Sequence, residues 1–88
     1  MYTLIVRTGC HLCDQAEESL LELEADLGIS WRAQNIDDDL GLAQYSDDLP
    51  VLLKDDRVIA RLTSSKAALA KALKPSLWRQ IKSSLQIN

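Results

Sequence analysis

The sequence has few of the features that stabilise small secreted proteins or that anchor a chain in a membrane. Cysteine occurs only twice, at Cys10 and Cys13, too close together for a disulfide-rich secreted protein. No apolar run approaches the roughly 20 residues that a membrane-spanning helix needs, and Met1 leads into a strand-like segment without the pattern of a signal peptide. We therefore expect a cytoplasmic protein without a membrane partner, in a reducing setting where cysteine pairs are typically catalytic or metal-binding.

Acidic and basic residues are divided unevenly between the two halves of the chain. Residues 1–44 carry two basic residues against nine acids, whereas residues 45–88 carry eight against four. The net charge of −3 disfavours non-specific binding to nucleic acid, and we interpret both segments as solvated helix faces. The length of 88 residues and the hydrophobic fraction of 47% predict one globular domain over residues 1–88.

The two cysteines form a C-x-x-C motif within Gly9-Cys10-His11-Leu12-Cys13-Asp14. The motif follows an apolar run typical of a buried strand and precedes a long amphipathic segment, so Cys10 is expected at the N-terminus of a helix. Free N–H groups and the helix dipole stabilise negative charge there, and thiols in such settings have pKa values of roughly 3.5–7.5. The motif therefore predicts a thiolate at Cys10 that attacks disulfides, with Cys13 as the resolving thiol.

Two polar neighbours of the cysteines are expected to modulate this chemistry. His11 is the only histidine, and as imidazolium it would stabilise the Cys10 thiolate, although an exposed residue without a role is an equal alternative. Asp14 would act in the opposite sense, or would only complement the helix dipole. Zinc is the competing chemistry, but a structural zinc site needs four ligands and this stretch supplies three, so we expect no metal within the chain.

The spacing of apolar residues predicts the order of the remaining elements. The expected strands cover residues 2–7, 30–36, 51–53 and 58–62. The expected helices cover residues 11–27, a short segment at about 39–45, and a segment that begins at Thr63, Ser64 or Ser65 and ends near residue 73. Pro75 is expected to end that helix, and a separate last helix would then carry Leu77, Trp78, Ile81 and Leu85 on one side.

This order is an α/β arrangement, β-α-β-α-β-β-α with a four-stranded mixed sheet and an extra C-terminal helix. The first two strands should be parallel because a helix connects them, and the last two should form a hairpin. The cysteine motif, the strand ending Asn35-Ile36-Asp37 and the segment Leu49-Pro50-Val51-Leu52 together resemble the small bacterial glutaredoxin-like proteins of the thioredoxin superfamily. The resemblance covers about residues 2–74 and implies a thioredoxin-like fold.

The resemblance also implies further site residues. The peptide bond before Pro50 would be cis, the proline would face the dithiol, and the backbone of Leu49 would pair with a bound disulfide partner. Arg7 stands where glutaredoxins often place a basic residue for glutathione, and Ser64 lies where the last helix start would bind a carboxylate. The stretch 60–65 lacks the Gly-Gly pair and the acidic residue common in glutaredoxins that use glutathione.

We therefore expect a thiol–disulfide oxidoreductase that carries Cys10 as nucleophile and Cys13 as resolving thiol. It would act as a monomer on protein or low-molecular-weight disulfides, without a bound cofactor and with glutathione as one candidate reductant. The alternative is a thioredoxin-fold binding module without turnover, in which the cysteine pair is a redox-sensitive latch. A Cys10 pKa near that of a free thiol would favour this alternative.

Overall fold

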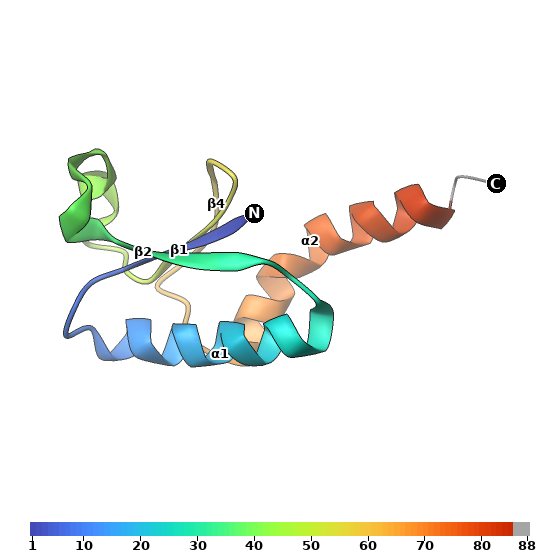
Figure 1. The fold of residues 1–88 in the computed structure, drawn as a ribbon, viewed down its shortest axis with the longest axis horizontal. Helices are drawn as coiled ribbons and strands as arrows, with labels where there is room; N and C mark the ends of the chain where they lie inside the picture. The colour runs from blue at the N-terminus through green and yellow to red at the C-terminus, as the bar shows by residue number, and fades with distance from the viewer. Residues whose placement is uncertain (86–88) are drawn as a thin grey trace.

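A mixed four-stranded sheet forms the centre of the fold (Figure 1). The computed structural model describes the backbone of residues 1–85 and the side chains of residues 1–75. The elements, in chain order, are β1 (Tyr2–Val6), α1 (His11–Leu27), β2 (Trp31–Asn35), the 3₁₀ turns η1 (Ile36–Asp38) and η2 (Leu40–Tyr45), β3 (Val51–Lys54), β4 (Arg57–Arg61) and α2 (Lys66–Leu85).

The strands lie in the order β2-β1-β3-β4. The β1 and β2 strands are parallel, with Val6 opposite Asn35, because α1 carries the chain back across the sheet. The β3 strand is antiparallel to both β1 and β4, and Ile5 lies opposite Val51. The ends of β1 and β2 and the beginning of β3 therefore meet at one edge of the sheet. The thioredoxin-like α/β fold with a four-stranded mixed sheet is confirmed.

One face of the sheet is covered by α1 and α2, and Figure 1 shows α1 running along it. Successive strand side chains point to opposite faces, so Leu4 faces these helices while Ile5 faces away. The buried residues of this face, which we call the helical cluster, are Tyr2, Leu4, Ala16, Leu20, Leu23, Ile29, Leu52, Leu69 and Leu73. The first helix contributes Ala16, Leu20 and Leu23, whose spacings of four and three residues place them on one side of the helix.

The opposite face is covered by the irregular segment that contains η1 and η2. Its buried residues, which we call the site cluster, are Ile5, Cys13, Ile36, Tyr45, Leu49, Val51 and Leu53. Cys10 is partly buried and packs against this cluster. The second core is thus built partly from the cysteine motif itself.

The short helix expected near residues 39–45 is replaced by two 3₁₀ turns. The side chain of Asn35 accepts a hydrogen bond from the N–H of Asp37 at 2.9 Å, and that of Asp39 accepts one from Gly41 at 2.9 Å. Each side chain starts a new turn by satisfying a free N–H group, so the chain is capped twice within a few residues. Two short turns form where one helix would otherwise continue.

The expectation that Pro75 ends the last helix is wrong, because α2 continues through it to Leu85. Proline fixes φ near the helical value, so it removes one hydrogen bond without preventing the backbone from remaining helical. The second half of α2 extends away from the sheet in Figure 1. The packing expected of Leu77, Trp78, Ile81 and Leu85 lies outside the described side chains. Within residues 1–85, neither helix combines the length and apolarity needed to cross a membrane.

Candidate active site

The cysteine pair lies at the edge of the sheet, where the chain passes from the end of β1 into α1. Cys10 is the N-cap residue of α1, with extended backbone angles of φ −92° and ψ 107°, and Cys13 lies in the first helical turn. Their sulfurs form a disulfide, with the two Cα atoms 5.1 Å apart. Cys10 is half-buried, whereas Cys13 is only 1% exposed. One sulfur therefore lies nearer to solvent, and the other is held behind it.

The sulfur of Cys10 takes part in capping the helix. The N–H of Cys13 donates a hydrogen bond to Cys10 Sγ at 3.1 Å, and the N–H of Asp14 donates to the Cys10 carbonyl at 3.1 Å. A residue at this position satisfies N–H groups that have no partner within the helix, and the positive end of the dipole lies there. The predicted position of the first cysteine at a helix N-terminus is confirmed. A thiolate at Cys10 would accept the same hydrogen bond from the N–H of Cys13.

The loop before β3 borders the cysteines. The peptide bond between Leu49 and Pro50 is cis, as the family resemblance implied. Pro50 is fully buried, and Leu49 belongs to the site cluster together with Cys13. Among the described residues, the N–H and C=O groups of Leu49 make no hydrogen bond to another main-chain group.

Ser64 lies in the loop between β4 and α2, and both of its polar groups bond to α1. The hydroxyl of Ser19 donates to the Ser64 carbonyl at 2.8 Å, and the Ser64 hydroxyl donates to Gln15 Oε1 at 3.3 Å. Gln15 Nε2 in turn lies 3.4 Å from Nε2 of His11. A polar chain thus joins the motif histidine to the loop that was expected to receive a carboxylate. The cap of α2 is Ser65, whose Oγ accepts from the N–H of Ala68 at 3.2 Å.

Two arginines lie beside the site, and each is close to an aspartate. The Nε of Arg7 is 3.8 Å from Oδ1 of Asp37, with both side chains exposed. Arg61 makes the shorter contact, with its Nη1 2.8 Å from Oδ2 of Asp48. Arg61 and Asp48 belong to none of the motifs in the sequence. They are thirteen residues apart and join only because β4 pairs with β3, so no local pattern could have found them.

No group of three or more His, Cys, Asp or Glu side chains in the described part of the chain is arranged to hold a metal ion.

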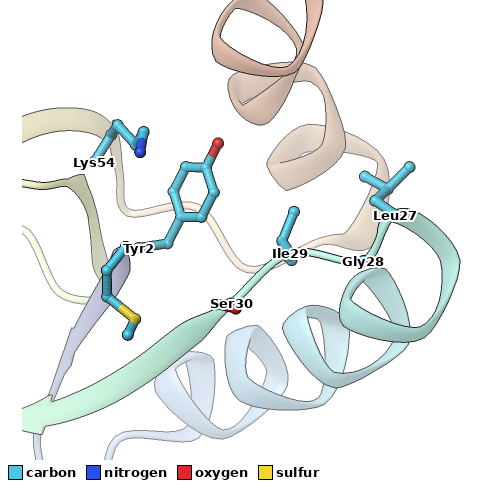
Figure 2. A pocket seen from close by; sticks show the side chains of 7 residues that line it. Tyr2, Leu27, Gly28, Ile29, Ser30 and Lys54 are labelled. Carbon is cyan, nitrogen blue, oxygen red and sulfur yellow. The ribbon is translucent and has the colours of Figure 1, made fainter. Parts of the chain in front are cut away.

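A cavity of about 220 Å³ lies at the far end of α1 (Figure 2). It is lined by Met1, Tyr2, Leu27, Gly28, Ile29, Ser30 and Lys54. Lys54 Nζ lies 5.1 Å from the centre of the Tyr2 ring. This cavity is separated from the cysteine pair by the length of the helix and is not part of the site.

The sheet, the disulfide at the N-terminus of α1 and the proline before β3 define a thioredoxin-fold redox domain. A family model described as "Glutaredoxin-like domain (DUF836)" matches residues 2–75. The chain therefore belongs to this glutaredoxin-like family. The family assignment made from the cysteine motif and the proline-opened strand is confirmed.

The solved structures that are similar to the chain include the following two. A protein from X. campestris, the structural genomics target XcR50, is 32% identical with a TM-score of 0.70, over 85% of this chain and 97% of that one. A structure titled as a malarial protein is 22% identical with a TM-score of 0.61, over 84% and 92% of the two chains, which supports the fold alone. No protein in the curated set matches the chain.

Proposed function

We propose that the protein is a thiol–disulfide oxidoreductase in which Cys10 is the nucleophile and Cys13 the resolving thiol. The observation that carries this proposal is the hydrogen bond from the N–H of Cys13 to Cys10 Sγ at the N-terminus of α1. The N–H group of Cys13 that donates to Cys10 Sγ in the disulfide form would stabilise a thiolate at Cys10 in the reduced form, so the Cys10 thiol should have a pKa below that of a free thiol.

The reaction is a two-step exchange. The Cys10 thiolate attacks one sulfur of a substrate disulfide, the substrate S–S bond breaks, and the first substrate thiolate leaves and takes a proton from solvent. Cys13 then loses its proton and attacks the sulfur of Cys10, which releases the second substrate thiol and forms the Cys10–Cys13 disulfide. Two electrons have passed from the protein dithiol to the substrate. A low-molecular-weight thiol such as glutathione, or a reductase, would regenerate the dithiol.

The surroundings give each neighbouring residue a proposed role. Leu49 and Pro50 would shape the docking groove, and the free main-chain groups of Leu49 would hold the partner in an extended conformation. His11 and Asp14 would adjust the stability of the Cys10 thiolate in opposite directions. Arg7 and Ser64 remain proposed substrate-binding residues. We further propose that the protein works as a monomer in the cytoplasm.

The test is the reduction of a mixed disulfide and of insulin by the pre-reduced protein, with the reductant panel extended from glutathione to thioredoxin-type systems. Cys10→Ser should show only the background rate. Cys13→Ser should instead accumulate the mixed disulfide, which mass spectrometry detects as an added mass on Cys10. If the wild-type protein turns over with none of these reductants, the proposal fails. A Cys10 pKa equal to that of a free thiol would then favour the redox-sensitive binding module.

A further inference from the structure

The ion pair between Asp48 and Arg61 joins the loop that precedes β3 to the end of β4. Arg61 Nη1 and Asp48 Oδ2 are 2.8 Å apart, and the N–H of Leu62 donates to the Asp48 carbonyl at 2.9 Å. Both the side chain and the main chain of Asp48 are therefore fixed. Because Asp48 directly precedes Leu49 and the cis Pro50, the pair lies beside the proposed docking groove.

This pairing decides which charge the groove presents to a substrate. Arg61 is about half exposed, at 49%, so its guanidinium is at the surface, but its nearest anion is a carboxylate of its own chain. Arg7, the other cation beside the site, has Asp37 within 3.8 Å. An incoming carboxylate must compete with these aspartates for either arginine.

The remaining charges around the groove are acidic. The segment that borders the site cluster contains five aspartates, and a sixth follows Cys13. They are Asp14, Asp37, Asp38, Asp39, Asp47 and Asp48. Several other cations of the described part lie away from this edge: Lys54 and Arg57 flank the turn between β3 and β4, and Lys66 pairs with Asp26 at the end of α1. The local field therefore attracts cations and repels anions.

We infer that Asp48 is a specificity-determining residue, which by holding Arg61 makes the site favour cationic and neutral disulfides over anionic ones. The inference rests on the proposed function, because it concerns the substrate of the same dithiol. It names a substrate class, in which the segments flanking the disulfide carry basic rather than acidic groups. Oxidised glutathione carries more carboxylate than ammonium groups, so it should be a disfavoured substrate.

The two small disulfides that separate these cases are cystamine, which carries two ammonium groups, and oxidised glutathione. Reduced protein, freed of reductant, is mixed with an excess of either one, and its oxidation is followed by acid quench, maleimide labelling and mass spectrometry. The measured quantity is the rate with oxidised glutathione divided by the rate with cystamine. Comparing this ratio between variants cancels the intrinsic reactivity of the two disulfides.

Asp48→Asn removes one negative charge and releases Arg61, so the ratio should rise by about fivefold at low salt. Arg61→Gln should lower the ratio by a similar factor, since the carboxylate of Asp48 is then unpaired. Both shifts should shrink at 0.5 M salt, where the screening length is only about 4 Å. Asp26→Asn is the matched control, because Asp26 also lies 2.8 Å from a basic side chain but at the other end of α1. Its ratio should equal that of the wild type.

A purely structural role of the ion pair would slow both disulfides alike and leave the ratio unchanged in Asp48→Asn and Arg61→Gln, which would overturn the inference. Opposite shifts in the two variants support it even if one variant is less stable. If neither disulfide oxidises the wild-type dithiol, the proposed function itself fails. If both disulfides oxidise the dithiol but the ratio responds neither to salt nor to either substitution, the inference fails while the proposed function stands.

Discussion

The two faces of the sheet are built differently. The helical cluster is covered by two regular helices, and its central leucines, Leu4, Leu20, Leu52, Leu69 and Leu73, are almost completely buried. The site cluster is covered by two short 3₁₀ turns and contains Cys13 and Leu49. The first face therefore carries the larger of the two buried apolar clusters, while the second places the cysteine pair in the same cluster as Leu49 of the loop before β3. Four predictions test this division of roles.

The largest expected effect is on the helical face. Leu20→Ala should lower the free energy of unfolding by about 3 kcal/mol, because it removes a fully buried side chain and leaves a cavity. Urea denaturation followed by circular dichroism measures this loss. Leu21→Ala on the same helix is the matched control, since Leu21 is 57% exposed and should change stability by less than about 0.5 kcal/mol. Equal losses in both variants would contradict the assignment of this core.

A somewhat smaller loss, about 2 kcal/mol, is expected for Ile36→Ala on the site face. Ile36 shares its cluster with Cys13, so this substitution should also loosen the packing around that thiol. In the reduced protein, iodoacetamide should alkylate Cys13 faster in Ile36→Ala than in Leu20→Ala. Leu40→Ala, at a side chain that is 92% exposed, should alter neither quantity. Identical alkylation rates in the two core variants would erase the distinction between the faces.

Ser19→Ala tests the connection between α1 and the loop that contains Ser64. It removes the hydroxyl that donates to the Ser64 carbonyl at 2.8 Å, and should cost about 1 kcal/mol in unfolding free energy. The comparison variant is Ser30→Ala, because Ser30 is exposed and its side chain should contribute almost nothing. A loss no greater than that of the control would mean that this tie does not stabilise the loop.

The smallest effect concerns the far end of α1. A hydrogen bond to Asp26, 2.8 Å away, raises the pKa of Lys66 above its ordinary value. The resulting stabilisation is therefore present below the ordinary lysine pKa and is lost as the pH rises through the folded-state pKa. An NMR titration of Lys66 should show its pKa falling in Asp26→Asn. An unchanged pKa would show that the contact is not maintained in solution.

Regular periodicity explains what could be predicted from the sequence. The first helix was placed at residues 11–27, as observed, because its apolar positions repeat at spacings of three and four and Gly28 ends it with φ 69°. The disulfide pair and the cis proline followed from local motifs combined with a family resemblance. These features depend on short stretches of chain, and the structure contains both of them.

Features that depend on distant contacts were missed. The pairing of Arg61 with Asp48, and of Ser19 with Ser64, arises only when strand pairing and helix packing bring the segments together. The prediction that the last helix ends at Pro75 was wrong because proline disfavours a helix without forbidding it. The single helix expected before β3 was wrong because Asn35 and Asp39 each begin a separate turn.

The sulfur of Cys10 is at once the proposed reacting atom and a hydrogen-bond acceptor of the helix backbone. Any change in the bonding of that sulfur should therefore change the hydrogen bond made by the amide of Cys13. The amide proton of Cys13 becomes an internal reporter, whose chemical shift should differ between thiolate, mixed disulfide and intramolecular disulfide. The catalytic cycle could be followed from the backbone alone, without a label on either cysteine.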